Sequence, residues 1–207
     1  NIFGNNITEE QVIRSNLEVD EGDPFNELLN AKSTNNLKSL NIFKTVKSEV
    51  IDGKENGTKI VNIEVEEKPT GEISLGAGVG SDGGTVGFAV SENNFLGKGV
   101  KLGLDLRLTE ETIRGSFSVN NPNFNYSGKS LVTSLESTKI DRLSTNGYES
   151  TKMGFSLGTG FEQYENTYIR PRLSSYFEDL TTNSDASANL KKQSGNYFET
   201  RFGYSLD

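Results

Sequence analysis

The chain has 207 residues, of which 32% are hydrophobic and 24% charged, and 29 acidic against 21 basic side chains leave a net charge of −8. It contains neither His nor Cys, which excludes His-based triads, cysteine nucleophiles, thiolate or histidine zinc sites and disulfide frameworks. The net acidity argues against a nucleic-acid partner, because neutralising phosphates needs clustered Lys and Arg.

No segment carries the roughly 18 consecutive apolar residues that a transmembrane helix needs. The chain opens at Asn1 with neither Met nor a signal peptide, which is expected of a fragment of a larger protein. We expect a protein that is not an enzyme, with no catalytic residues, no cofactor and no metal.

The composition changes near residue 69. Residues 1–68 hold 4 of the 22 glycines and no tyrosine, whereas residues 69–207 hold 18 glycines and all 7 tyrosines. A glycine- and aromatic-rich part with short alternating segments is typical of a large antiparallel sheet or barrel. A proline at position 69 marks the boundary, since it cannot donate to a strand ladder. We predict two domains, 1–68 and 69–207.

Two helices are expected in the first domain. Thr8-Glu9-Glu10-Gln11 forms a capping box, in which the Thr8 hydroxyl accepts from an orphan amide, so a helix is predicted to start there. Glu21-Gly22-Asp23-Pro24 then turns the chain, and a second helix is expected from about Phe25 or Asn26. Its predicted inward positions are all leucines: Leu28, Leu29, Leu37 and Leu40.

Three strands complete the first domain. Residues 43–50 and the alternating residues 60–65 predict two strands, joined by a hairpin turn at 52–57. The leading Ile2-Phe3-Gly4 indicates the end of a strand whose start is missing. The predicted order is therefore strand, helix, helix, strand, strand, an α+β arrangement.

The second domain alternates with a period of two. In residues 100–108 an aliphatic face alternates with a polar one, which places Leu102, Leu104 and Leu106 opposite Lys101, Asp105 and Arg107. About eight such segments follow one another. A soluble sandwich also alternates, with its apolar face inward, so alternation does not by itself separate it from a membrane barrel. The glycine-rich polar face favours a water-filled lumen over a packed core.

The loops add a second criterion. Short turns are expected at 93–99 and 162–167, and longer polar excursions at 139–147 and 178–196. One end with short turns and one with long loops is typical of an outer-membrane barrel. We predict about eight antiparallel transmembrane strands, an incomplete β-barrel, after the α+β domain.

The sequence also resembles a known family. Residues 21–25, 41–46 and 65–69 are similar to the last polypeptide-transport-associated (POTRA) domain of the BamA family of outer-membrane assembly factors. Residues 70–80 resemble that family's first barrel strand, and the segments 93–99 and 121–124 resemble its first two periplasmic turns. The resemblance implies a longer protein in the cell outer membrane, with residues 1–68 in the periplasm and a 16-stranded barrel.

The resemblance implies a mechanism as well. Unfolded outer-membrane protein clients would be folded and inserted by β-augmentation, in which an incoming strand pairs with the first barrel strand. The residues of this client-pairing edge are Gly71, Ile73, Leu75, Gly76, Gly78 and Gly80. The glycines either weaken pairing at the edge or leave lumen-side space beneath an inward loop. The first domain is expected to offer clients a second exposed edge.

Glu21 has two interpretations. It either solvates the turn between the helices or, as the resemblance implies, docks a periplasmic lipoprotein of the assembly complex. Outer-membrane lipid is the remaining expected partner. Two other functions stay open: a related POTRA transporter that secretes a client through its lumen, as in two-partner secretion, and a soluble adhesin-like β protein.

Overall fold

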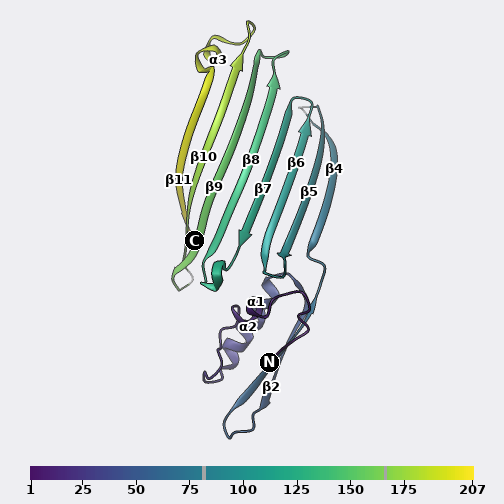
Figure 1. The fold of residues 1–207 in the computed structure, drawn as a ribbon, viewed down its shortest axis with the longest axis vertical. Helices are drawn as coiled ribbons and strands as arrows, with labels where there is room; N and C mark the ends of the chain where they lie inside the picture. The colour runs from purple at the N-terminus through teal and green to yellow at the C-terminus, as the bar shows by residue number, and fades with distance from the viewer. Residues whose placement is uncertain (81–82, 166) are drawn as a thin grey trace. The chain divides into compact units, whose positions relative to one another are not determined.

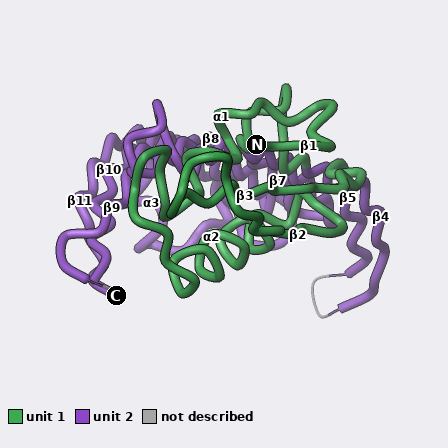
Figure 2. The backbone as a smooth tube through the Cα atoms, turned by 90° about the horizontal axis from the view of Figure 1, so that it is seen from below, with its two compact units in different colours: residues 1–71, 92–100 green, residues 72–91, 101–207 purple. Residues whose placement is uncertain are grey.

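The computed structural model describes residues 1–80, 83–165 and 167–207. The chain divides into two compact units, coloured separately in Figure 2. Unit 1 contains residues 1–71 and 92–100, and unit 2 contains residues 72–91 and 101–207. Among the described residues, no helix is long and apolar enough to span a membrane.

Unit 1 has the predicted order of elements. Its described residues form β1 (Ile2–Phe3), α1 (Glu10–Arg14), α2 (Glu27–Ser39), β2 (Phe43–Asp52) and β3 (Lys59–Glu67). The strand order is β1-β3-β2, with β1 parallel and β2 antiparallel to β3. The strands β2 and β3 are longer than predicted, and their hairpin turn lies at 53–58.

The helices and the sheet of unit 1 enclose one apolar core. Its most buried side chains are Ile13 from α1, Leu37 from α2 and Ile42 at the start of β2, each exposed by 1% or less. Val46, Ile63 and Val65 cover the same face of the sheet. Removing these apolar surfaces from water is the main contribution to the stability of this small unit.

Two predictions about the helices are wrong. The capping box does not form: α1 begins at Glu10, and the Thr8 hydroxyl instead accepts a hydrogen bond from Asn94 at 2.9 Å. The second helix starts as predicted, with the Asn26 side chain accepting from the amides of residues 28 and 29. Its first leucines, however, do not face the core.

Ser33 occupies the inward position that the leucine pattern assigned to the first turns of α2. Leu28 is 80% exposed and Leu29 38%, whereas Ser33 is 3% exposed. The Ser33 hydroxyl accepts from the Glu18 amide at 2.7 Å and donates to the Leu29 carbonyl at 2.9 Å. The loop between the helices therefore lies over this part of α2 and takes the place of apolar packing.

Eight antiparallel strands, β4 to β11, form one open sheet in the described part of the chain, as predicted (Figure 1). They are β4 (Gly71–Gly80), β5 (Gly83–Phe95), β6 (Val100–Thr109), β7 (Thr112–Asn121), β8 (Ser130–Arg142), β9 (Tyr148–Tyr164), β10 (Thr167–Thr182) and β11 (Gly195–Leu206). A short helix α3 (Ala188–Gln193) lies between β10 and β11, and a 3-10 turn (Phe124–Tyr126) lies between β7 and β8. The sheet does not close into a barrel.

The predicted contrast between turns and loops holds only in part. The connection after β10 is the long one, spanning residues 183–194 and containing α3. The connection after β8 spans only residues 143–147, because β8 and β9 extend further than predicted. On the opposite end, the connection after β7 is longer, at residues 122–129. The side chains of Asn121 and Asn123 accept hydrogen bonds from backbone amides of that turn and so stabilise it.

The pairing register separates the sheet into two faces. Leu104 lies opposite Phe117, which lies opposite Leu135, which lies opposite Phe155. On the other face a polar row runs across five strands: Gly103, Ser118, Ser134, Ser156 and Ser174. Leu102, Leu104 and Leu106 thus share one face, and Lys101, Asp105 and Arg107 share the other, as the alternation predicted.

Candidate functional site

Strand β4 lies at one edge of the eight-stranded sheet. Within the described residues its hydrogen-bonded neighbour is β5, and every residue of β4 is exposed. Ile73 is 70% exposed, Leu75 79% and Val79 93%. The strand therefore presents both apolar side chains and one side of its backbone to any chain that approaches the edge.

The glycines of β4 stand in open space. A Cβ atom built on Gly76, Gly78 or Gly80 meets no described heavy atom within 4 Å. No close approach inside the described residues therefore requires glycine at these positions. Each glycine removes a cross-strand side-chain contact that would otherwise fix the pairing of this edge.

Hydrogen bonds to unit 1 hold the chain at the start of β4 more firmly than along the rest of the strand. The Thr70 hydroxyl donates to the Glu92 carboxylate at 2.5 Å, and the Thr70 carbonyl accepts from the Asn93 backbone amide at 3.2 Å. The same Glu92 oxygen accepts from the Asn94 amide at 2.6 Å. These groups all belong to unit 1. Edge strand β4 is thus held at Thr70, just before its first residue, and is exposed from Gly71 onward.

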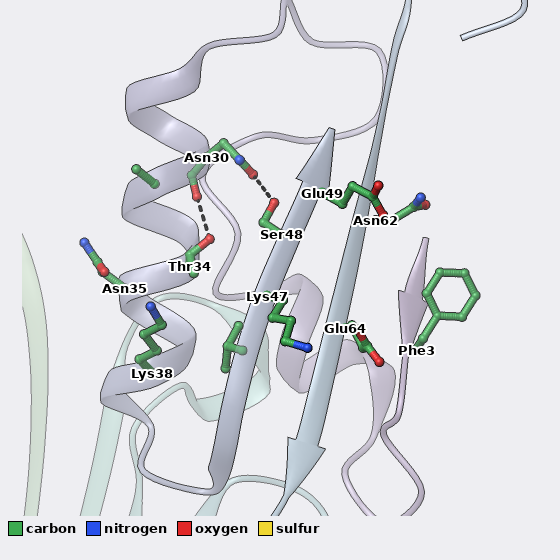
Figure 3. Close-up of a pocket in the computed structure, with 12 residues that line it drawn as sticks. Phe3, Asn30, Thr34, Asn35, Lys38, Lys47, Ser48, Glu49, Asn62 and Glu64 are labelled. Atoms are coloured by element: carbon green, nitrogen blue, oxygen red, sulfur yellow. Dashed lines mark hydrogen bonds between the residues drawn. The ribbon is translucent and has the colours of Figure 1, made fainter. Parts of the chain in front are cut away.

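A second candidate site is a groove of about 850 Å³ in unit 1, between α2 and β2 (Figure 3). Asn30 shapes the helical side: its side-chain oxygen accepts from the Ser48 hydroxyl at 3.0 Å, and its carbonyl accepts from the Thr34 hydroxyl at 3.0 Å. β2 is an edge of its sheet, so its backbone borders the groove. The charged side chains that line the groove are balanced: Lys38, Lys47, Glu49 and Glu64.

Glu21 is exposed but not unpartnered. Its side chain is 87% exposed, and its carboxylate accepts from Arg14 Nη1 at 2.9 Å. Arg14 also donates to Glu10 at 2.7 Å, and these hydrogen bonds, the one to Glu10 first, raise the pKa of Arg14. A cationic partner at Glu21 would have to compete with Arg14. The pair escaped the sequence pattern because the interhelical loop, not a helix repeat, brings the two residues together.

The polar face of the sheet contains an aromatic contact that the sequence pattern did not reveal. Tyr176 on β10 lies opposite Gly154 on β9, and a Cβ at that glycine would be only 2.6 Å from the tyrosine ring. Lys152 and Arg201 lie 5.0 and 5.2 Å from the ring centroid. The tyrosine thus covers the glycine, and two cations lie over its ring. Only the strand register brings these residues together.

Comparisons with protein families assign both parts of the chain. A model described as the Omp85 superfamily domain matches residues 94–207. The chain belongs to the Omp85 superfamily. A POTRA model, described as the surface antigen variable number repeat, matches residues 1–68. The α+β unit of this Omp85 chain is therefore a POTRA domain, and the eight-stranded sheet is part of the barrel domain.

Its curated relatives are outer-membrane protein assembly factors called BamA. The chain is 28% identical over 189 residues to BamA of Neisseria meningitidis, covering 88% of this chain and 24% of that protein. It is 36% identical over 110 residues to BamA of Neorickettsia risticii, covering 52% of this chain and 14% of that protein. The chain thus spans about a quarter or less of these relatives.

Solved structures show the same fold. BamA from Haemophilus ducreyi lacking POTRA domains 1–3 matches with a TM-score of 0.76 and 22% identity, covering 99% of this chain and 41% of that one. CdiB from Escherichia coli matches with a TM-score of 0.63 and 15% identity, and CdiB from Acinetobacter baumannii with 0.57 and 12%. Each of these two matches covers 96% of this chain and 39% of the CdiB chain.

The family assignment gives the location of the Omp85 chain. It is an outer-membrane chain, with the POTRA domain of residues 1–68 in the periplasm. The soluble adhesin-like alternative is therefore wrong. The apolar face of the sheet, with Leu104, Phe117 and Leu135 in one row, is the kind of surface that faces lipid in such proteins.

Proposed function

We propose that this chain is part of an assembly factor that folds and inserts outer-membrane proteins by β-augmentation at β4. The observation that carries the proposal is the position of β4 at the end of the strand order, held at Thr70 and followed by glycines at 76, 78 and 80 that offer no side chain to a partner strand. The similarity to BamA proteins, which are named as assembly factors, supports the same function.

The proposed recognition uses backbone groups. The side of β4 that faces away from β5 presents amides and carbonyls to an incoming strand, so hydrogen bonds form without regard to client sequence. The exposed Ile73, Leu75 and Val79 would pack against apolar residues of that strand. Gly76, Gly78 and Gly80 have no side chains to contact a paired strand, so one pairing partner can be exchanged for another more easily. No covalent chemistry is needed, so the proposed function is not enzymatic.

The groove beside β2 is the proposed second site for clients. An extended segment would add to the β2 edge and lie along α2. The balanced charges around the groove favour neither acidic nor basic segments. Unfolded clients of varied sequence would therefore be held in the periplasm before they reach β4.

Glu21 is the proposed contact for a periplasmic lipoprotein of the assembly complex. The segment around it is acidic in sequence, with Asp20, Asp23 and Glu27. A basic side chain of the partner would replace Arg14 at the Glu21 carboxylate. This exchange leaves the domain intact, because an exposed ion pair contributes little to folding.

A secretion pore is the second candidate function. The CdiB structures share the fold, and the polar sheet face with its serine row would suit a client that crosses the lumen. In that case β4 would remain paired with its closing strand throughout transport. Locking the β4 edge therefore separates the two functions.

The test is a cysteine pair that joins Leu75→Cys to the closing strand of the complete protein, with Cα atoms within about 7 Å. The matched control joins Ser118→Cys on β7 to Ser134→Cys on β8, two residues that face each other inside the sheet. Oxidation of the Leu75 pair should abolish client insertion into liposomes and reduction should restore it, whereas the control pair should have no effect. Equal insertion by the oxidised and reduced Leu75 pair would contradict the edge mechanism and favour lumen secretion.

A further inference from the structure

The turn between β5 and β6 belongs to unit 1, and it contacts the loop between β1 and α1. The Glu9 amide donates to the Gly97 carbonyl at 2.8 Å. The Asn94 side-chain amide donates to the Thr8 hydroxyl at 2.9 Å. Thr8 is 3% exposed and Asn94 7%, so this second hydrogen bond is shielded from water. Such buried polar contacts are costly to leave unmade.

Glu67 extends this contact to the end of β3. Its carboxylate accepts from the backbone amides of Asn6, Ile7 and Thr8, at 3.0, 3.0 and 2.6 Å. Partial burial acts to raise the pKa of Glu67, but these hydrogen bonds together lower it below the usual glutamate value. Thr8 thus connects the two residues: its amide bonds to Glu67 and its hydroxyl bonds to Asn94. We call these three residues the Thr8 bridge.

The backbone of the turn fits closely against the same loop. Gly97 has φ +73°, and a Cβ there would be 2.1 Å from the Ile7 carbonyl oxygen. The Asn94 side-chain oxygen accepts from the Gly99 amide at 2.8 Å. Asn94 therefore shapes the turn with one side-chain atom and ties it to the POTRA domain with the other.

Three strand ends meet in the part of the chain held by the Thr8 bridge. β4 begins at Gly71, one residue after Thr70, which bonds to Glu92. β5 ends at Phe95 and β6 begins at Val100, on either side of the turn. A displacement of the POTRA domain would therefore move the ends of β4, β5 and β6 together.

We propose that Glu67, Thr8 and Asn94 are positioning residues for client insertion, which make residues 92–100 move with the POTRA domain and so transmit its displacement to the β4 edge. The inference rests on the proposed insertion function. It adds a mechanical input to the edge: client or lipoprotein binding on the POTRA domain would change how strand β4 is presented.

The test measures the turn and the activity separately, in the complete protein in liposomes. Spin labels at Ser39→Cys in α2 and Lys98→Cys in the turn report the distance between the helix and the turn. Thr8→Val removes the bridging hydroxyl, Asn94→Ala removes its partner, and Thr8→Ser keeps the hydroxyl. Thr58→Val is the matched control, because its hydroxyl bonds only within the β2–β3 hairpin turn, to the Glu55 carbonyl.

The unaltered protein, Thr8→Ser and Thr58→Val are expected to show one narrow distance and full insertion. The turn between β5 and β6 is either held against the loop between β1 and α1 or released from it. Each hydrogen bond removed lowers the ratio of held to released turn about fivefold. The double variant Thr8→Val with Asn94→Ala removes two hydrogen bonds, the one from Asn94 to Thr8 and the one from the Gly99 amide to Asn94. It should therefore shift this ratio about 25-fold, broaden the distance distribution and slow insertion by up to the same factor. A narrow distance and full insertion in Thr8→Ser, beside a loss in Thr8→Val, would show that the hydroxyl, and not the packing of the side chain, is responsible.

Two results would overturn the inference. A narrow distance in the double variant would show that the Thr8 bridge does not hold the turn. A broad distance with an unchanged insertion rate would show that the turn is held but not used, and would leave the insertion function standing. Failure of the unaltered protein to insert clients would instead overturn the proposed function, and the positioning role with it.

Discussion

Leu104→Arg is expected to impair membrane insertion far more than Asp105→Arg. Leu104 lies opposite Phe117, which lies opposite Leu135, so the new cation would enter a continuous apolar row. Asp105 is the next residue but lies on the polar face, opposite Ser116. The two variants add the same side chain to the same strand and differ only in the face that receives it.

The depth of Leu104 sets the size of the effect. It is four residues from Val100, where β6 begins, and five from Thr109, where β6 ends. At about 3.3 Å per residue and a tilt of about 40°, this places Leu104 about 10 Å inside an apolar band about 25 Å tall. An arginine that close to the midplane costs about 2 to 4 kcal/mol, which is about 30- to 900-fold in the folding equilibrium.

The assay is a urea titration of folding into liposomes, carried out on the complete protein. Leu104→Arg should strongly lower the urea concentration at the folding midpoint or prevent folding, whereas the midpoint of Asp105→Arg should stay close to that of the unaltered protein. Equal loss in both variants, or a greater loss in Asp105→Arg, would refute the assignment of the leucine face to lipid.

Three further predictions concern single contacts. Glu21→Lys should weaken pull-down of periplasmic assembly partners without changing the thermal unfolding of the POTRA domain, and unchanged pull-down would leave Glu21 as a turn residue paired with Arg14. The pKa of Glu67 is lower in the folded protein, so its ionised carboxylate stabilises the domain at pH values above the ordinary glutamate pKa of about 4.3. This stabilisation is lost as the pH falls through the folded pKa. Glu67→Gln should therefore make the thermal unfolding temperature less dependent on pH in this range. Gly154→Ala should destabilise the sheet through the Tyr176 ring, and Tyr176→Ala should relieve that loss; the absence of relief in urea titrations would show that the ring is not responsible.

Local patterns were sufficient for the order of the elements and for the faces of the sheet. The alternation around Leu104 predicted the two faces of the sheet, and the eight strands followed from the same period. The turn at residues 21–24 predicted the start of α2 near residue 26, where the Asn26 side chain caps the helix. Gly71 to Gly80 were identified through the family resemblance, and the structure places them at a sheet edge.

Contacts between distant segments were not predictable in this way. Thr8 carried a capping pattern, yet its hydroxyl bonds to Asn94, 86 residues away, because the returning chain brings a buried amide to it. Leu28 was assigned to the apolar face, yet it is exposed, because it lies nine residues before the buried Leu37 and so on the opposite side of the helix at 3.6 residues per turn.

The sequence by itself determined the strand period and the sheet faces, because these depend on interactions within a few residues along the chain. The tertiary structure decided the pairing register that sets Tyr176 over Gly154, and the attachment of residues 92–100 to the POTRA domain. Both depend on where the chain returns in space, and a competing partner from a distant segment can outweigh the local preference of any one residue.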